Sequence, residues 1–106
     1  MKIAALLIAA VAAANANAVV VRGGPSCPEW TKSRQTTNEG ANANEFWLLG
    51  YLSGLAVSSN ADVLRNTTNP SLMAWIDNYC RTNTLHYLEQ AGSGLFNELK
   101  RQKEIR

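Results

Sequence analysis

The clearest signal for the fold lies in residues 69–80, which read NPSLMAWIDNYC. An apolar stripe recurs there at intervals of three and four residues, and it consists of Leu72, Trp75, Ile76, Tyr79 and Cys80. This spacing places side chains on one face of an α-helix. An asparagine cap at Asn69 and a proline at the first helical position, Pro70, suit the start of such a helix. The stretch therefore predicts an amphipathic helix with Cys80 on its buried face.

The first 18 residues have the pattern of a secretory signal peptide. A single lysine, Lys2, precedes the apolar run from Ile3 to Ala14, and small residues then suit cleavage after Ala18, with cleavage after Ala16 as the weaker alternative. The run is shorter than the roughly 20 apolar residues of a bilayer-spanning helix. An uncleaved N-terminal anchor is the competing interpretation. We expect a periplasmic or secreted mature chain, residues 19–106, without an integral membrane segment.

The two cysteines of the chain, Cys27 and Cys80, predict one disulfide. An isolated pair in an exported protein is most simply a disulfide, and a domain this small benefits from a covalent link. Two free thiols or a metal site are the alternatives. The single histidine, His86, and two cysteines do not easily complete a tetrahedral zinc shell, which makes a metal the weaker explanation.

Size and charge limit the class of protein. Residues 19–106 are enough for one small domain. Removing Lys2 from the ten Lys and Arg leaves nine, against eight Asp and Glu, so the mature side chains sum to +1. The only cluster of basic residues lies in a C-terminal tail, residues 100–106. A nucleic-acid-binding domain usually carries a basic stripe, so nucleic acid is not the expected partner.

The most hydrophobic stretch of the mature chain, residues 45–57, reads EFWLLGYLSGLAV. Its apolar residues go all the way round a helix, which predicts the buried central helix, with a buried strand as the alternative. Gly50, Ser53 and Gly54 fall on one side of that helix. They predict a groove of small residues in which a neighbouring element packs closely.

The remaining segments complete an all-α prediction. Residues 19–26 are a flexible leader, residues 29–35 a short helix that carries Trp30 inward, and residues 36–44 a loop. Ser58–Asn69 is a polar connection, and leucines at helical spacing from Leu85 onward predict a last helix. The expected fold is a small bundle of about four helices stapled by one disulfide.

The sequence contains no recognisable catalytic constellation. His86 has no accompanying G-x-S-x-G motif, and Asp77 and Arg81 are spaced to form an ordinary helix ion pair. We therefore predict no enzyme, no cofactor and no metal. The aromatic and small residues that we expect to form either the core or an interface are Trp30, Phe46, Trp47, Gly50, Tyr51, Gly54, Trp75, Ile76 and Tyr79.

Four short segments resemble known exported proteins: residues 27–30 (CPEW), 47–54 (WLLGYLSG), 75–80 (WIDNYC) and 88–91 (LEQA). Together they resemble small proteins of Gram-negative bacteria related to HdeA, the periplasmic acid-stress chaperone. The GYLSG helix followed by a Tyr-Cys pair also resembles the Rap/Tai-type immunity proteins, which block secreted cell-wall amidases. Those immunity proteins usually carry more cysteines, and HdeA matches GYLSG less well.

Each resemblance implies a different protein partner. An HdeA-like chaperone binds client proteins when acid loosens its fold, whereas an immunity protein plugs a toxin with a rigid loop, here Ser58–Asn69. Members of unknown function are a third group, and a small enzyme is the least expected. A second copy of the chain is also a candidate partner. If a homodimer forms, we expect the helix from Phe46 to Val57 to be its surface.

Overall fold

The computed structural model describes residues 19–20, 22–36 and 39–105, of which residues 39–42 and 105 are described by their backbone. Within these residues the chain forms four α-helices and no strand, which confirms the all-α prediction. The helices are α2 (Cys27–Arg34), α3 (Glu39–Ser58), α4 (Asn69–Thr82) and α5 (Leu88–Ile105). The predicted signal peptide, residues 1–18, lies outside the described residues.

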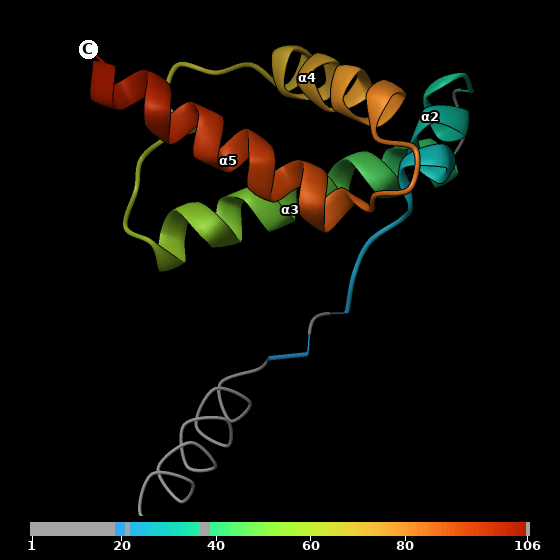
Figure 1. Ribbon diagram of the computed structural model, residues 1–106, viewed down its shortest axis with the longest axis horizontal. Helices are drawn as coiled ribbons and strands as arrows, with labels where there is room; N and C mark the ends of the chain where they lie inside the picture. The colour runs from blue at the N-terminus through green and yellow to red at the C-terminus, as the bar shows by residue number, and fades with distance from the viewer. Residues whose placement is uncertain (1–18, 21, 37–38, 106) are drawn as a thin grey trace, which may run out of the picture.

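The four helices pack around one core, so that each of them contacts two others. α5 lies between α3 and α4, and the short α2 contacts α3 and α4 at the end of the bundle nearest the α4–α5 connection (Figure 1). Each helix thus packs mainly against two others, and one apolar core forms among them. Its buried side chains are Cys27, Trp30, Leu48, Leu52, Val63, Leu72, Met73, Ile76, Cys80, Leu88, Ala91, Leu95, Phe96 and Leu99.

The predicted disulfide is formed between Cys27 and Cys80 and joins the first residue of α2 to α4. The backbone next to it pairs with the α4–α5 connection. Cys27 N donates to the His86 carbonyl at 2.9 Å, and Leu88 N donates to the Pro25 carbonyl at 3.0 Å. The last residues of the leader are therefore fixed to the start of α5 by hydrogen bonds as well as by the disulfide.

Both helices that begin with a proline in their first turn start with a reciprocal cap. Ser26 accepts from Glu29 N ahead of α2, and Thr68 accepts from Ser71 N at 3.2 Å ahead of α4. The predicted cap at Asn69 is thus one residue late. The Thr68 hydroxyl takes the role because it reaches the N3 amide, while Asn69 already belongs to the first turn.

The prediction of a fully buried helix over residues 45–57 is wrong in two respects. The helix begins at Glu39, inside the predicted loop, and one side of it faces solvent. Leu48 and Leu52 are completely buried, but a Cβ added at Gly50 or Gly54 would meet no neighbouring atom within 4 Å. The expected close packing in this groove is therefore absent, because α2 and α5 cover only the opposite side of α3.

The last two helices depart from the predicted stripes at their edges. α5 begins at Leu88, whereas the prediction extended the helical spacing back to Leu85. Leu85 is 91 % exposed, and Tyr87, just before the helix, forms an isolated antiparallel bridge with Ser26. On α4, Trp75 and Tyr79 are half-buried at the margin of the core, while Met73 is buried. The basic tail continues α5 as regular helix up to residue 105.

Candidate functional site: the outer face of α3

The solvent-facing side of α3 is apolar and uncharged. It consists of Phe46, Gly50, Ser53, Gly54 and Val57, which we call the outer face of α3. Phe46 is 70 % exposed and Val57 is 82 % exposed, and the residues between them carry small side chains. The face runs along about 16 Å of helix, at 1.5 Å of rise per residue. Two large exposed hydrophobic side chains thus flank a strip of accessible backbone.

This arrangement follows from the composition of α3. Leu48 and Leu52 supply the buried side of the helix. Because the sequence is apolar on the other side as well, hydrophobic residues are left in water once the bundle has closed. Exposed apolar groups that gather on one surface are typical of binding sites, whereas scattered ones are ordinary.

An aromatic pair borders the outer face. The rings of Trp47 and Tyr51 stack with centroids 5.1 Å apart and planes 10° from parallel. The leader crosses this pair, since the Trp47 ring lies directly against Gly24. Tyr51 is held from the other side, where its hydroxyl shares a 2.8 Å hydrogen bond with Ser93 of α5. The pair is therefore a rigid, half-buried edge of the outer face.

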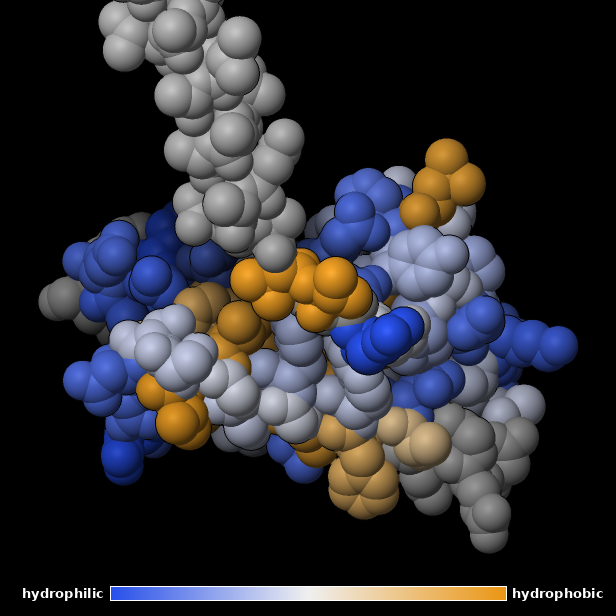
Figure 2. Space-filling model, turned by 90° about the horizontal axis from the view of Figure 1, so that it is seen from below, coloured by the Kyte–Doolittle hydropathy of each residue, from blue (hydrophilic) through white to orange (hydrophobic). Residues whose placement is uncertain are grey.

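A shallow hollow of about 360 Å³ adjoins this aromatic edge. Its lining residues are Arg22, Phe46, Trp47, Gly50 and Tyr51. Figure 2 views the molecule from below, the side on which α3 lies in Figure 1, and shows orange hydrophobic groups and pale, weakly polar ones with blue hydrophilic groups among and around them. Aromatic residues and arginine dominate the energetically important positions of protein interfaces. The hollow and the outer face together have the composition of such an interface.

A polar network joins α2, α3 and α4. Asp77 accepts from Trp30 Nε1 at 2.8 Å and from two nitrogens of Arg34 at 2.9 and 3.0 Å. Arg34 also lies 3.7 Å from Glu45 of α3. The hydrogen bond to Asp77 raises the pKa of Arg34 above its usual value. The predicted pair of Asp77 with Arg81 is wrong, because Arg81 instead donates to Asn78 at 2.6 Å.

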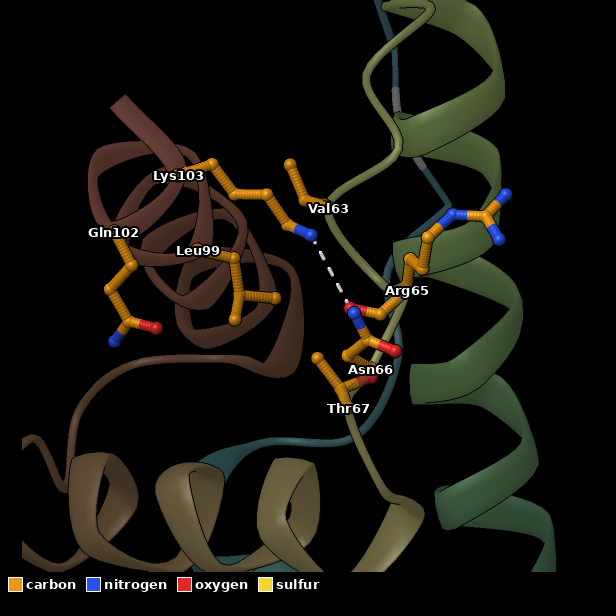
Figure 3. A pocket seen from close by; sticks show the side chains of 7 residues that line it. All are labelled: Val63, Arg65, Asn66, Thr67, Leu99, Gln102 and Lys103. Carbon is orange, nitrogen blue, oxygen red and sulfur yellow. Dashed lines mark hydrogen bonds between the residues drawn. The ribbon is translucent and has the colours of Figure 1, made fainter. Parts of the chain in front are cut away.

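The α3–α4 connection, residues 59–68, forms a second candidate surface. Its buried Val63 anchors it, Asn60 and Asn66 adopt positive φ, and Arg65 pairs with Asp62. A small cavity of about 80 Å³ separates the connection from the end of α5, and Lys103 Nζ spans it to the Arg65 carbonyl at 3.3 Å (Figure 3). The connection is thus an ordered, polar loop tied to α5.

The predicted core or interface residues fall into separate groups. Trp30 and Ile76 belong to the buried core, whereas Phe46, Gly50 and Gly54 lie on the outer face of α3, with Trp47 and Tyr51 at its border. On α4, Trp75 and Tyr79 stack with centroids 5.6 Å apart. The Tyr79 hydroxyl shares a 2.6 Å hydrogen bond with His86 Nδ1. Sequence reasoning missed Arg22, since no local pattern shows that the leader reaches α3.

Two features of the described residues bear on metal binding and on membranes. Among the described residues, His, Cys, Asp and Glu do not gather in any group of three or more that could hold a metal ion. No helix in the described ranges is both long and apolar enough to cross a membrane.

Comparison with known proteins returns no match: no family model, no curated protein and no solved structure is significantly similar to this chain.

Proposed function

We propose that this protein is an exported binding factor that holds another protein on the outer face of α3. The observation that carries the proposal is the exposure of Phe46 and Val57 on a helix that completely buries Leu48 and Leu52 on its other side. Gly50 and Gly54 let a partner's backbone approach closely between them. Export, to the periplasm or beyond the cell, is supported by the signal-peptide pattern of residues 1–18 and by the disulfide.

The HdeA-like form of this proposal is an acid-stress chaperone. Ion pairs with carboxylates hold Arg34 between α2, α3 and α4, and such ion pairs are weakened in strong acid. Neutral carboxylates also leave the basic residues of the chain unbalanced, and the resulting repulsion favours a looser state. The disulfide keeps that state compact. Helix surfaces that are buried at neutral pH then extend the outer face of α3 for unfolded clients.

The test of the binding face uses light scattering of a model client that is diluted from denaturant without any reductant, with and without the protein at neutral and acid pH. We expect the Phe46→Ser, Val57→Ser double variant to lose suppression of aggregation while its melting temperature stays unchanged. Leu85→Ser is the matched control, since Leu85 is as exposed but lies on the α4–α5 turn. Equal suppression by the double variant and the wild type would exclude the outer face of α3.

The acid step is tested on the purified protein alone. Tryptophan fluorescence, dye binding and sedimentation are followed from pH 7 to pH 2. New dye binding below about pH 3, where the carboxylates become protonated, is the expected result. A compact protein that binds no dye at pH 2 would exclude the acid-chaperone form and leave binding at neutral pH.

The ordered connection 59–68 favours a second candidate function, an immunity-like inhibitor of a secreted cell-wall amidase. A rigid polar loop is suited to enter an enzyme cleft without paying a large ordering entropy. The test is inhibition of purified cell-wall amidases. This function predicts that the Arg65→Glu variant loses inhibition and that the Phe46→Ser, Val57→Ser variant retains it; the reverse result would contradict it.

A further inference from the structure

A groove runs between α2 and α4, away from the outer face of α3. It contains two adjoining hollows of about 380 and 280 Å³, which share Thr31, Gln35 and Arg81. The larger hollow is also lined by Pro28, Lys32, Cys80 and Thr84, and the smaller one by Arg34 and Asp77. No residue of α3 lines either hollow, so the groove is a surface of its own.

The lining of the groove has a net positive charge. Of its three cations, Arg34 is already engaged by Asp77 and Glu45. Lys32 and Arg81 are exposed, and within the described part of the chain neither lies within 4.0 Å of a carboxylate oxygen. Asp77 is the only acid in the lining of the two hollows, and its carboxylate accepts from both Trp30 and Arg34. Lys32 and Arg81 therefore offer charge to a ligand.

The rest of the lining limits the kind of ligand. Pro28 and the buried Cys80 give the larger hollow an apolar base, and Thr31, Gln35 and Thr84 place hydroxyl and amide groups around it. We infer that the groove binds an acidic, partly apolar segment of a partner protein. Carboxylates of the segment pair with Lys32 and Arg81, and an apolar side chain packs on Pro28. A bare polyanion would gain nothing from the apolar base.

The test measures fluorescence anisotropy of a labelled octapeptide of glutamates with one central leucine, titrated with the disulfide-bonded protein. We expect saturable binding at low salt that weakens as salt rises, because exposed charge pairs are screened. Lys32→Glu and Arg81→Glu each weaken binding by about tenfold or more, as reversal of an interface charge does. Replacing the leucine by glutamate weakens binding although it adds negative charge.

Three controls make the result specific. Lys100→Glu changes an exposed cation on α5 that lies over Phe96 instead of in the groove, and it should leave the affinity within about twofold. The neutral Lys32→Gln, Arg81→Gln double variant, with an unchanged melting temperature, should also lose binding. Phe46→Ser should retain peptide binding, which separates this groove from the proposed client face. Equal weakening by Lys100→Glu, unchanged affinity after Arg81→Glu, or equally tight binding of polyphosphate would overturn the inference.

Discussion

At the scale of single residues, Asp77 is the polar link between α2 and α4. Its carboxylate accepts from Trp30 of the core and from Arg34, and it thereby joins α2 to α4 beside the disulfide. The Trp30 indole is completely buried, and its N–H needs an acceptor. One acidic residue therefore both satisfies the largest core side chain and fixes the direction of α2.

We predict that Asp77→Asn destabilises the protein. An amide can still accept from Trp30 but loses the ionic, two-nitrogen contact with Arg34. Because about one third of each side chain is exposed, solvent screens the pair, and we expect a loss of about 1–2 kcal/mol. Urea unfolding measures it. Asp62→Asn, which breaks the far more exposed pair with Arg65, is the control and should change stability much less.

Glu98 is a second residue with a defined electrostatic role. Hydrogen bonds lower the pKa of Glu98 from the usual 4.5 to about 2; the larger effect comes from Arg101 and the smaller from Gln102. Since this pKa is lower in the folded state, the contribution of Glu98 to stability is present above pH 4.5. It is lost as the pH falls from 4.5 to about 2.

NMR titration of the Glu98 side chain should therefore give a midpoint near 2. Glu98→Gln should reduce the fall in stability between pH 4.5 and pH 2 relative to the wild type, because the substituted residue no longer takes up a proton there. Glu104→Gln on the same helix is the control. A midpoint near 4.5 would show that the contacts of Glu98 with Arg101 and Gln102 do not persist in solution.

At the scale of helices, two glycines inside helices have opposite surroundings. Gly92 of α5 faces the Tyr51 ring, and a Cβ built there would lie 2.8 Å from the ring carbon Cδ2. Gly54 of α3 lies on the solvent side with open space around it. The close contact between α3 and α5 therefore depends on Gly92, while Gly54 weakens its own helix without improving its packing.

We predict opposite effects of alanine at these two positions. Gly92→Ala should destabilise the protein by roughly 1–2 kcal/mol, because Tyr51 is held by Trp47 and Ser93 and cannot easily move away. Gly54→Ala should stabilise it by roughly 0.5–1 kcal/mol through helix propensity. Thermal and urea unfolding measure both. If Gly54→Ala also weakens client binding despite the higher stability, close approach to the outer face of α3 is supported.

At the scale of the whole molecule, the disulfide is the main constraint on the unfolded chain. It joins residues 53 positions apart, and both cysteines are buried in the core. Closing a loop of that size stabilises a folded protein by about 4 kcal/mol in the chain-entropy model. The four helices share a single small core, so this contribution is a large part of the expected total.

Reduction of the protein should therefore lower its stability by a few kcal/mol. Urea unfolding with and without a phosphine reductant measures the effect, and a Cys27→Ala, Cys80→Ala variant without reductant is the control for side reactions. Equal stability of the oxidised and reduced forms would contradict the prediction. Alkylation of two thiols in the native protein would contradict the disulfide itself.

The helical class, the α4 stripe and the cysteine pairing could be read from the amino-acid pattern because each rests on local or pairwise information. The spacing from Leu72 to Cys80 depends only on helix geometry, and two cysteines allow one intramolecular bond. The cap of α4 was predicted one residue late, at Asn69 instead of Thr68, and the Ser26 cap of α2 was not predicted. Trp30 was correctly placed inward, although its acceptor Asp77 was assigned to Arg81 instead.

Which side of α3 stays in water was decided only by the tertiary packing. Its sequence is apolar all round, so no periodicity distinguishes Leu48 from Phe46. α2 and α5 pack on one side of α3, which buries Leu48 and leaves Phe46 exposed to solvent. The groove between α2 and α4 likewise depends on the tertiary structure, because Lys32 and Arg81 are 49 positions apart in the sequence and line one hollow together with Cys80. Such surfaces depend on contacts between distant segments, and these form only when the whole bundle closes.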